Sequence, residues 1–306
     1  MDYFYVVAGL VGLFFGGEAL VRGSVGVARR LAIPPLLIGL TVVGFGTSTP
    51  ELLVSVQAAL RGVPDIAVGN IVGSNIANIL LIVGVTALVW PITVTGATLR
   101  RDTLVMVAAA LVLVPVFALG VIGRLPGLVL VAGLAGYLVW AYRTPGAAEP
   151  EDADLPAPSS TWVSVLWVVG GLVVLMAGAR FLVDGSVNIA RGFGISEAFI
   201  GLTIVAVGTS LPELATSLIA AFRRQSEIAI GNIVGSNIFN VLGILGLTAI
   251  ITPVPVAGRF LTFDLPVMIV ASLVLTALLL TRPQIGRVMG VGLLVAYVGY
   301  VWAAQG

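Results

Sequence analysis

Cysteine, histidine and lysine are all absent from this 306-residue chain, and charged residues of any kind make up only 9% of it. Without cysteine or histidine, the chain cannot form disulfides, thiolate or imidazole metal sites, or imidazole proton relays. Because a typical soluble domain is about 25% charged, the shortage of charge excludes an ordinary soluble protein, and the apolar content excludes a disordered one. The net charge of +1 excludes the basic field of a nucleic-acid-binding protein.

Hydrophobic residues make up 59% of the chain and lie in long continuous runs. A bilayer-spanning helix takes about 20 such residues, whereas a membrane β-barrel would alternate apolar and polar positions. The sequence therefore predicts an all-α integral membrane protein with ten transmembrane helices, embedded in a lipid bilayer. The ten predicted spans cover residues 3–22, 33–60, 66–90, 103–120, 125–142, 162–182, 196–222, 228–251, 264–281 and 286–303.

One polar stretch, residues 143–161, interrupts the apolar runs and carries four acids among prolines and alanines. This composition predicts a solvated linker between residues 1–142 and residues 162–306. If the N-terminus is extracellular, ten of the 15 arginines face the cytoplasm. By the positive-inside rule, we therefore expect a multi-pass protein of the cell membrane with both termini outside and a cytoplasmic linker.

The two halves carry an internal repeat at a constant offset of 162 residues. Residues 66–78 read IAVGNIVGSNIAN and residues 228–240 read IAIGNIVGSNIFN, and a Pro-Glu-Leu motif at 50–52 recurs at 212–214. Equivalent points are five predicted spans apart, and an odd number of spans turns the second copy upside down. We therefore expect two inverted five-helix repeats, an architecture of secondary transporters whose binding site lies near the membrane midplane.

Glu51 and Glu213 are the acids that this repeat places inside apolar spans. A carboxylate in hydrocarbon costs at least about 2.5–3.5 kcal/mol, so each must be protonated, paired or bound to a cation. An ion pair with arginine is disfavoured, because the second, third, seventh and eighth spans contain none. Pro50 and Pro212 lack a backbone N–H, so we expect the second and seventh helices to be broken beside the two acids.

Hydroxyl and amide side chains recur at helical spacing around the two acids. The neutral oxygens that we expect to converge on the carboxylates belong to Thr47, Ser48, Ser74, Asn78, Thr209, Ser210, Ser236 and Asn240. Such hard oxygen donors suit Ca²⁺ or Na⁺, and a site that accepts either ion can exchange one for the other. Four further amides either join this site or form hydrogen bonds between helices: Asn70, Asn75, Asn232 and Asn237.

The paired GTSxPEL and GNIVGSN segments resemble the two α-repeats of the cation/calcium antiporter superfamily, above all its prokaryotic sodium/calcium exchangers. The resemblance covers nearly the whole chain. It implies a secondary active antiporter that exports Ca²⁺ in exchange for Na⁺ by alternating access, with Glu51 and Glu213 bridging the central ion sites. It also implies that the backbone carbonyls of Gly44 and Ala206 are ion ligands.

The chain differs from part of this family at Asn78 and Asn240, because some relatives carry Asp at one of these two positions. Two carboxylates and two amides limit the charge of the site to −2, which Ca²⁺ neutralises and three Na⁺ would exceed by one. The ion ratio and any potassium dependence therefore stay open. Since the linker is too short for the calcium-sensing insertion of animal exchangers, we do not expect direct allosteric regulation by calcium.

The residues alone leave other functions open. Proton/calcium exchange would use the same Glu51 and Glu213, since an empty, desolvated carboxylate accepts a proton more readily. A cation channel would need a continuous pore, and a membrane scaffold would bind no ion through either acid. An enzyme is not expected, because no general base accompanies the Thr-Ser pairs. We also expect no cofactor and no obligate protein partner. The glycine-rich first and sixth spans favour sliding across the bundle or close packing equally.

Overall fold

The computed structural model describes the chain except for residues 32, 94–96, 145–159, 195–205, 283 and 305–306. Eight of the described helices are long and apolar enough to cross a membrane, or nine if the bent pair Pro35–Thr47 and Thr49–Leu60 counts as one span. The chain is therefore an all-α multi-pass membrane protein. Much of the predicted span 196–222 lies outside the described residues, and its described remainder includes the short apolar helix Leu211–Phe222.

The helices follow the apolar runs, with π-helical turns (η) interrupting several of them. The N-terminal half contains α1 Asp2–Leu31, α2 Pro35–Ile38, η1 Gly39–Val43, α3 Gly44–Thr47, α4 Thr49–Leu60, α5 Pro64–Ala77, η2 Asn78–Ile82, α6 Val83–Val89, α7 Ala97–Ala118 and α8 Arg124–Arg143. The C-terminal half contains α9 Thr161–Gly192, α11 Ala206–Gly208, α12 Leu211–Phe222, α13 Ser226–Ile238, η4 Phe239–Leu245, α14 Gly246–Ile251, η5 Phe260–Asp264, α15 Leu265–Thr281 and α16 Arg287–Ala304.

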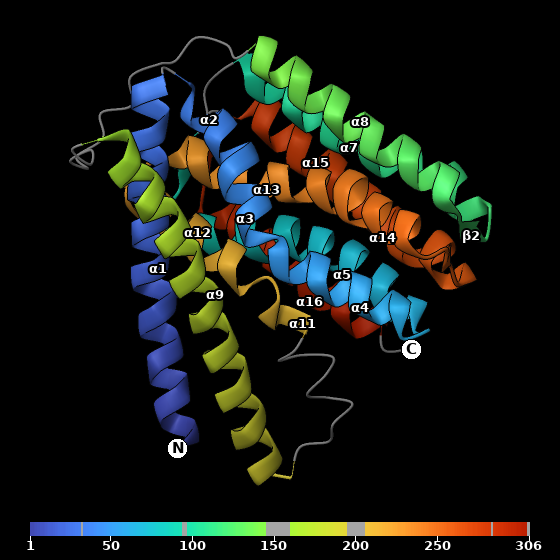
Figure 1. Ribbon diagram of the computed structural model, residues 1–306, viewed down its shortest axis with the longest axis horizontal. Helices are drawn as coiled ribbons and strands as arrows, with labels where there is room; N and C mark the ends of the chain where they lie inside the picture. The colour runs from blue at the N-terminus through green and yellow to red at the C-terminus, as the bar shows by residue number, and fades with distance from the viewer. Residues whose placement is uncertain (32, 94–96, 145–159, 195–205, 283, 305–306) are drawn as a thin grey trace.

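Helices α1 and α9 run side by side as a long pair (Figure 1). Their backbones approach closely because glycines line the contact. A methyl group on Gly178 of α9 would lie only 2.7 Å from the backbone nitrogen of Leu13 in α1. Glycine at this position is thus required by the packing of the pair, which agrees with the close-packing interpretation of these spans; sliding of the pair stays a prediction.

Helices α1 and α9 extend beyond the predicted limits of these two spans, 3–22 and 162–182, at their C-terminal ends. The helices have 30 and 32 residues, or about 45–48 Å at 1.5 Å per residue, against a hydrocarbon core of about 30 Å. The predicted first span ends at Arg22. The helix continues past this residue, which pairs with Glu18 one turn earlier, with 2.6 Å between Nε and Oε1.

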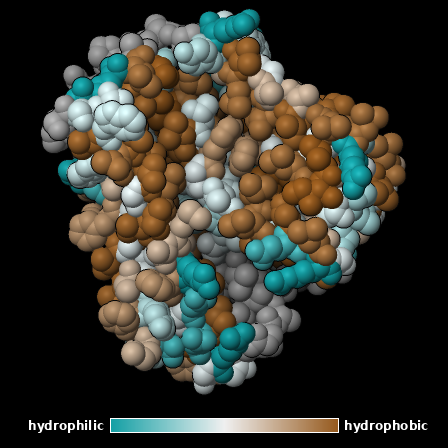
Figure 2. Space-filling view, viewed as in Figure 1, coloured by the Kyte–Doolittle hydropathy of each residue, from teal (hydrophilic) through white to brown (hydrophobic). Residues whose placement is uncertain are grey.

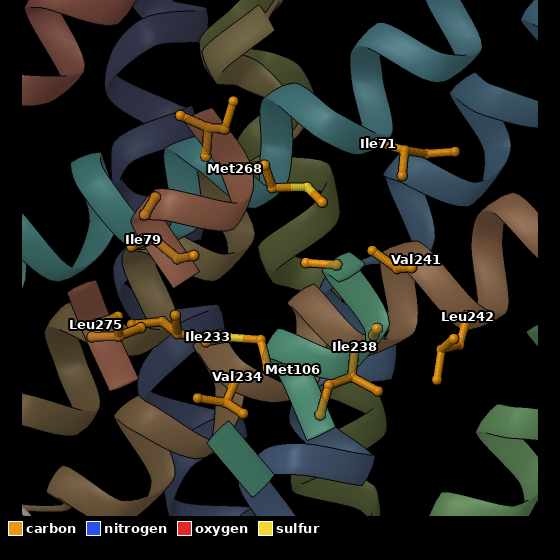
Figure 3. Packing of buried hydrophobic residues seen from close by; sticks show 14 of the residues in the cluster. Ile71, Ile79, Met106, Ile233, Val234, Ile238, Val241, Leu242, Met268 and Leu275 are labelled. Carbon is orange, nitrogen blue, oxygen red and sulfur yellow. The ribbon is translucent and has the colours of Figure 1, made fainter. Parts of the chain in front are cut away.

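The core of the bundle surrounds α5 and α13, which begin the two most deeply buried spans. Figure 3 shows buried side chains from several helices of both halves meeting here, among them Met106 of α7 and Met268 of α15. On the surface, hydrophobic residues cover most of the face in Figure 2, and hydrophilic residues form smaller patches, several near its upper and lower margins. The polar groups described below are therefore enclosed by an apolar bundle.

Four two-residue strands join loops of one half to loops of the other. β1 (Ile92–Thr93) pairs antiparallel with β4 (Gln284–Ile285), and β2 (Val121–Ile122) pairs antiparallel with β3 (Val254–Pro255). These strands were not predictable from the sequence, because two extended residues at the end of an apolar run carry no periodic signal. They fasten the two halves together at the ends of the helices.

The acidic linker falls largely outside the described residues. Arg143 still belongs to α8 and Thr161 already belongs to α9, so the predicted limits 143–161 overlap each helix by one residue. The start of α9 is fixed by Ser160, whose Oγ accepts a hydrogen bond of 3.2 Å from the backbone N–H of Val163. This is the N-cap interaction that serine commonly provides.

Candidate functional site

Two helix breaks form the centre of the candidate site. Between α3 and α4, Ser48 leaves the helical conformation with φ −82° and ψ 7°. The chain bends there by 44° between the helical stretches Pro35–Thr47 and Thr49–Leu60. Ser210, which precedes α12, has nearly the same backbone angles, φ −89° and ψ 6°. A proline follows each break in the first turn of the next helix, where its missing N–H needs no partner. The predicted breaks beside Glu51 and Glu213 are therefore present.

The carboxyl groups of Glu51 and Glu213 lie in these first turns and are almost completely buried, with exposed fractions of 0% and 1%. Each meets the broken turn of the opposite half. Ser48 Oγ donates a hydrogen bond of 3.0 Å to Glu213 Oε1, and Ser210 Oγ donates one of 3.4 Å to Glu51 Oε1. Because the two contacts are equivalent under the 162-residue offset, the two breaks face each other with their acids crossed.

One oxygen of each carboxylate is left for another partner. Among the described residues, Oε2 of Glu51 and Oε2 of Glu213 are buried without a hydrogen bond, as are Oδ1 of Asn78 and Oδ1 of Asn240. Buried polar atoms normally have a partner. Four orphaned oxygens that are related in two pairs by the repeat, two of them on carboxylates, have the chemistry of a cation site.

Asn78 and Asn240 owe their orientation to amides of the opposite half. Asn78 Nδ2 donates to Asn237 Oδ1, and Asn240 Nδ2 donates to Asn75 Oδ1, each at 3.0 Å. Asn78 begins the π-helical turn η2 and Asn240 lies within η4. Such turns often accompany functional sites, but the sequence gives no simple signal for them.

The other two repeated amides, Asn70 and Asn232, hold the Glu-bearing helices in place. Asn70 Nδ2 donates to the backbone carbonyl of Glu51 at 3.1 Å, and Asn232 Nδ2 donates to that of Glu213 at 3.2 Å. Each amide also donates to a serine hydroxyl one turn after the glutamate on the Glu-bearing helix. Asn70 Nδ2 lies 2.9 Å from Ser55 Oγ, and Asn232 Nδ2 lies 3.0 Å from Ser217 Oγ. These contacts agree with the interpretation of Asn70 and Asn232 as hydrogen-bonding partners between helices.

The remaining predicted residues border this centre. Thr47 Oγ1 lies 3.0 Å from Asn232 Oδ1 and also donates to the Gly44 carbonyl, which in addition accepts a bond of 3.3 Å from Ser236 Oγ. Ser74 is buried on α5, and Thr209 follows α11 directly. Ala206 begins α11, one residue after a stretch outside the described residues.

Three buried acids were missed because they stand near the ends of apolar runs. Asp102 accepts hydrogen bonds from Arg101 Nε (2.6 Å) and Tyr137 (3.2 Å). Asp264 makes the equivalent contacts with Arg259 (3.3 Å) and Tyr300 (3.0 Å). Since positions 102 and 264 also differ by 162, the repeat was the signal that could have identified them. The third acid, Glu18, pairs with Arg22 and Arg223.

No group of three or more Asp, Glu, His or Cys side chains that could together hold a metal ion occurs among the described residues. A cation at this centre would therefore depend on two carboxylates and on neutral oxygens. A family model described as the sodium/calcium exchanger protein matches residues 1–143 and 163–305.

The chain belongs to the sodium/calcium exchanger family.

Proteins related to this exchanger family member match it over nearly their whole length. The inner membrane protein YrbG of Escherichia coli K12 is 38% identical, over 98% of this chain and 95% of the relative. The sodium/calcium exchanger MaX1 of Methanosarcina acetivorans is 33% identical, over 98% and 97%. A solved structure of the sodium-calcium exchanger NCX_Mj, soaked with 2.5 mM Na⁺ and 0.1 mM Ca²⁺, has a TM-score of 0.86 and 32% identity, over 98% of this chain and 97% of that one. An exchanger is a transporter and not an enzyme, in line with the sequence analysis.

Proposed function

We propose that this exchanger family member is a secondary active antiporter of the cell membrane that exports Ca²⁺ in exchange for Na⁺ by alternating access. The family and the ions named for MaX1 and NCX_Mj support the pair of ions. The observation that carries the proposal is the set of four orphaned oxygens on Glu51, Glu213, Asn78 and Asn240. Two carboxylates balance the charge of one Ca²⁺, and Na⁺ accepts the same donors.

The proposed architecture is ten helices in two inverted repeats, residues 1–142 and 162–306, joined by a cytoplasmic linker at 143–161. The bent span Pro35–Leu60 supplies the second helix, and α12 is proposed as the described end of the seventh. The equivalent crossed contacts of Ser48 and Ser210 support a two-fold relation between the halves. Extracellular termini follow from the arginine distribution.

The proposed ion ligands fall into three classes. Glu51 and Glu213 supply charge, and their crossed position lets one ion touch both halves. Hydroxyl and amide oxygens complete the shell, and two backbone carbonyls are further proposed ligands. The neutral ligands are Thr47, Ser48, Ser74, Asn78, Thr209, Ser210, Ser236 and Asn240, and the carbonyls are those of Gly44 and Ala206.

The deciding experiment is uptake of radioactive calcium by proteoliposomes, with sodium, potassium and proton gradients imposed one at a time. An outward sodium gradient is expected to drive uptake. Glu51→Gln and Glu213→Gln are each expected to reduce it to the level of protein-free liposomes, because each removes half of the charge of the site. Asp65→Asn is the matched control, since Asp65 is an exposed acid at the start of α5.

Other outcomes would contradict the proposal. Uptake that follows a pH gradient and ignores sodium would establish proton/calcium exchange through the same two acids. Calcium flux that needs no counter-ion would indicate a channel. Full sodium-driven uptake by both Gln variants would show that the ions bind elsewhere.

A further inference from the structure

Two chains of three side chains run through the core behind Asn78 and Asn240. In the first, Met106 Sδ accepts a hydrogen bond of 3.6 Å from Asn237 Nδ2, and Asn237 Oδ1 accepts one of 3.0 Å from Asn78 Nδ2. The Oδ1 atom of Asn78 is the free end, with no hydrogen bond among the described residues. Each of these three side chains has an exposed fraction of 3% or less, so bulk water does not compete for these contacts.

The second chain repeats the first at an offset of 162. Met268 Sδ accepts a hydrogen bond of 3.5 Å from Asn75 Nδ2, which also donates one of 3.2 Å to the backbone carbonyl of Asn237. Asn75 Oδ1 accepts one of 3.0 Å from Asn240 Nδ2. The Oδ1 atom of Asn240 is again the free end. Each series of side chains alternates between the two halves of the protein. Asn237 of the C-terminal half contacts Asn78 of the N-terminal half, and Asn75 of the N-terminal half contacts Asn240 of the C-terminal half.

The direction of these hydrogen bonds matters because an amide has two unlike ends. Its oxygen attracts a cation, whereas its NH₂ group is a donor and repels one. A thioether sulfur accepts but does not donate, so Met106 holds the NH₂ group of Asn237 and leaves the oxygen of Asn237 to face Asn78. Asn78 must then turn its own NH₂ group toward Asn237, which leaves its oxygen for the site.

We propose that Asn75 and Asn237 are positioning residues that fix the amide orientation of Asn240 and Asn78. Met106 holds the NH₂ group of Asn237, and Met268 together with the Asn237 backbone carbonyl holds that of Asn75. The inference rests on the proposed function and explains how a site with only two carboxylates obtains two reliable neutral oxygens. An aspartate at position 78 or 240 would present oxygen in either orientation and would need no such partner.

The test is a double-mutant cycle on calcium affinity, measured by calorimetry with CaCl₂ on the purified full-length protein. Asn237→Leu keeps the size of the side chain but removes the acceptor, and it is expected to raise the Kd about tenfold. In an Asn78→Asp background the same substitution is expected not to raise the Kd, because the Asn237 oxygen then faces an acceptor and no longer a donor. In an Asn240→Asp background it is expected to retain its full effect.

Equal losses in all backgrounds would overturn the proposal, because they would mean that Asn237 only supports packing. If Asn237→Leu fails to fold, Asn75→Leu with Asn240→Asp gives the same cycle in the other chain. Met106→Leu conserves volume and is also expected to weaken calcium binding, to a smaller extent than Asn237→Leu. Calcium binding that is unchanged in both Met106→Leu and Asn237→Leu would also overturn the proposal.

Failure of the proposed function would look different. A wild-type protein that binds no calcium and shows no sodium-driven flux would contradict the proposed function itself. Binding by wild type and its loss in Glu51→Gln, together with an additive cycle, would overturn only the positioning role of Asn75 and Asn237.

Discussion

Glu51 and Glu213 each satisfy one carboxylate oxygen with a serine from the opposite half and leave the other oxygen without a partner among the described residues. Burial of such a group is costly unless a cation or proton compensates it. The serine hydroxyls do not remove that cost, but they hold each carboxylate in one orientation. Ion affinity should therefore depend on these two hydroxyls in equal measure.

Ser48→Ala and Ser210→Ala are each expected to raise the Kd for calcium at least about tenfold, since a hydrogen bond to a charged group contributes about 1.5–3 kcal/mol. Calorimetric titration of the purified variants measures this. Ser272→Ala is the control, because the hydroxyl of Ser272 bonds to the Met268 carbonyl of its own helix at 2.8 Å. A Kd unchanged by both site substitutions would show that the hydroxyls do not shape the site.

The sequence predicted the residue types at this centre better than their partners. The offset of 162 identified Glu51 and Glu213, and their crossed serines were among the expected oxygens. It did not reveal that Asn75 orients Asn240. That contact joins positions 165 residues apart, and the spacing of residues in the sequence does not show how helices pack in the bundle. Asp102 was passed over for a related reason: its position beside Arg101 looked like the end of a span.

At the scale of helices, α1 and α9 carry ion pairs at equivalent positions, but the two ion pairs differ in their charges and their surroundings. Glu18 in α1 binds Arg223, which follows α12, with 2.7 Å between NH2 and Oε1. In α9 the equivalent positions carry the opposite charges, Arg180 and Asp184, and these form only an exposed pair at 3.7 Å. The first contact therefore ties α1 to a Glu-bearing helix, whereas an exposed pair contributes little.

Glu18→Gln is expected to loosen the C-terminal end of α12 from α1 and to speed hydrogen–deuterium exchange there about tenfold, because two charge-assisted bonds are weakened. Mass spectrometry of exchanged peptides covering residues 211–225 gives the rate. Asp184→Asn removes an exposed acid and should leave exchange in α9 unchanged. Identical rates at α12 in wild type and Glu18→Gln would rule out this tether.

The helices themselves were largely predictable, since apolar runs of bilayer length leave few alternatives. Their ends were less so: α1 continues to Leu31, past the predicted limit at Arg22, and the contact of Glu18 with Arg223 is invisible in a hydropathy profile. The break at Ser48 was expected from Pro50. The π-helical turn at Asn78 was not, because it depends on packing against the opposite half.

For the whole molecule, an ion held between the halves should stabilise the fold. A ligand at about 100 times its Kd adds about 2.7 kcal/mol to the stability of a protein that binds it only when folded. Calcium is therefore expected to raise the melting temperature of the wild-type protein and of Asp65→Asn, but not that of Glu51→Gln. Differential scanning fluorimetry on tryptophan emission measures this; an equal rise in all three would place the stabilising ion outside the proposed site.

The crossed hydrogen bonds also bear on how such a duplicated chain can change over generations. A duplicated segment is commonly free to drift once the other copy retains the original role. Here Ser48 meets Glu213 and Asn78 meets Asn237, so each copy forms part of the surroundings in which the other must fit. A substitution at one of these positions therefore changes the surroundings of its partner in the other half.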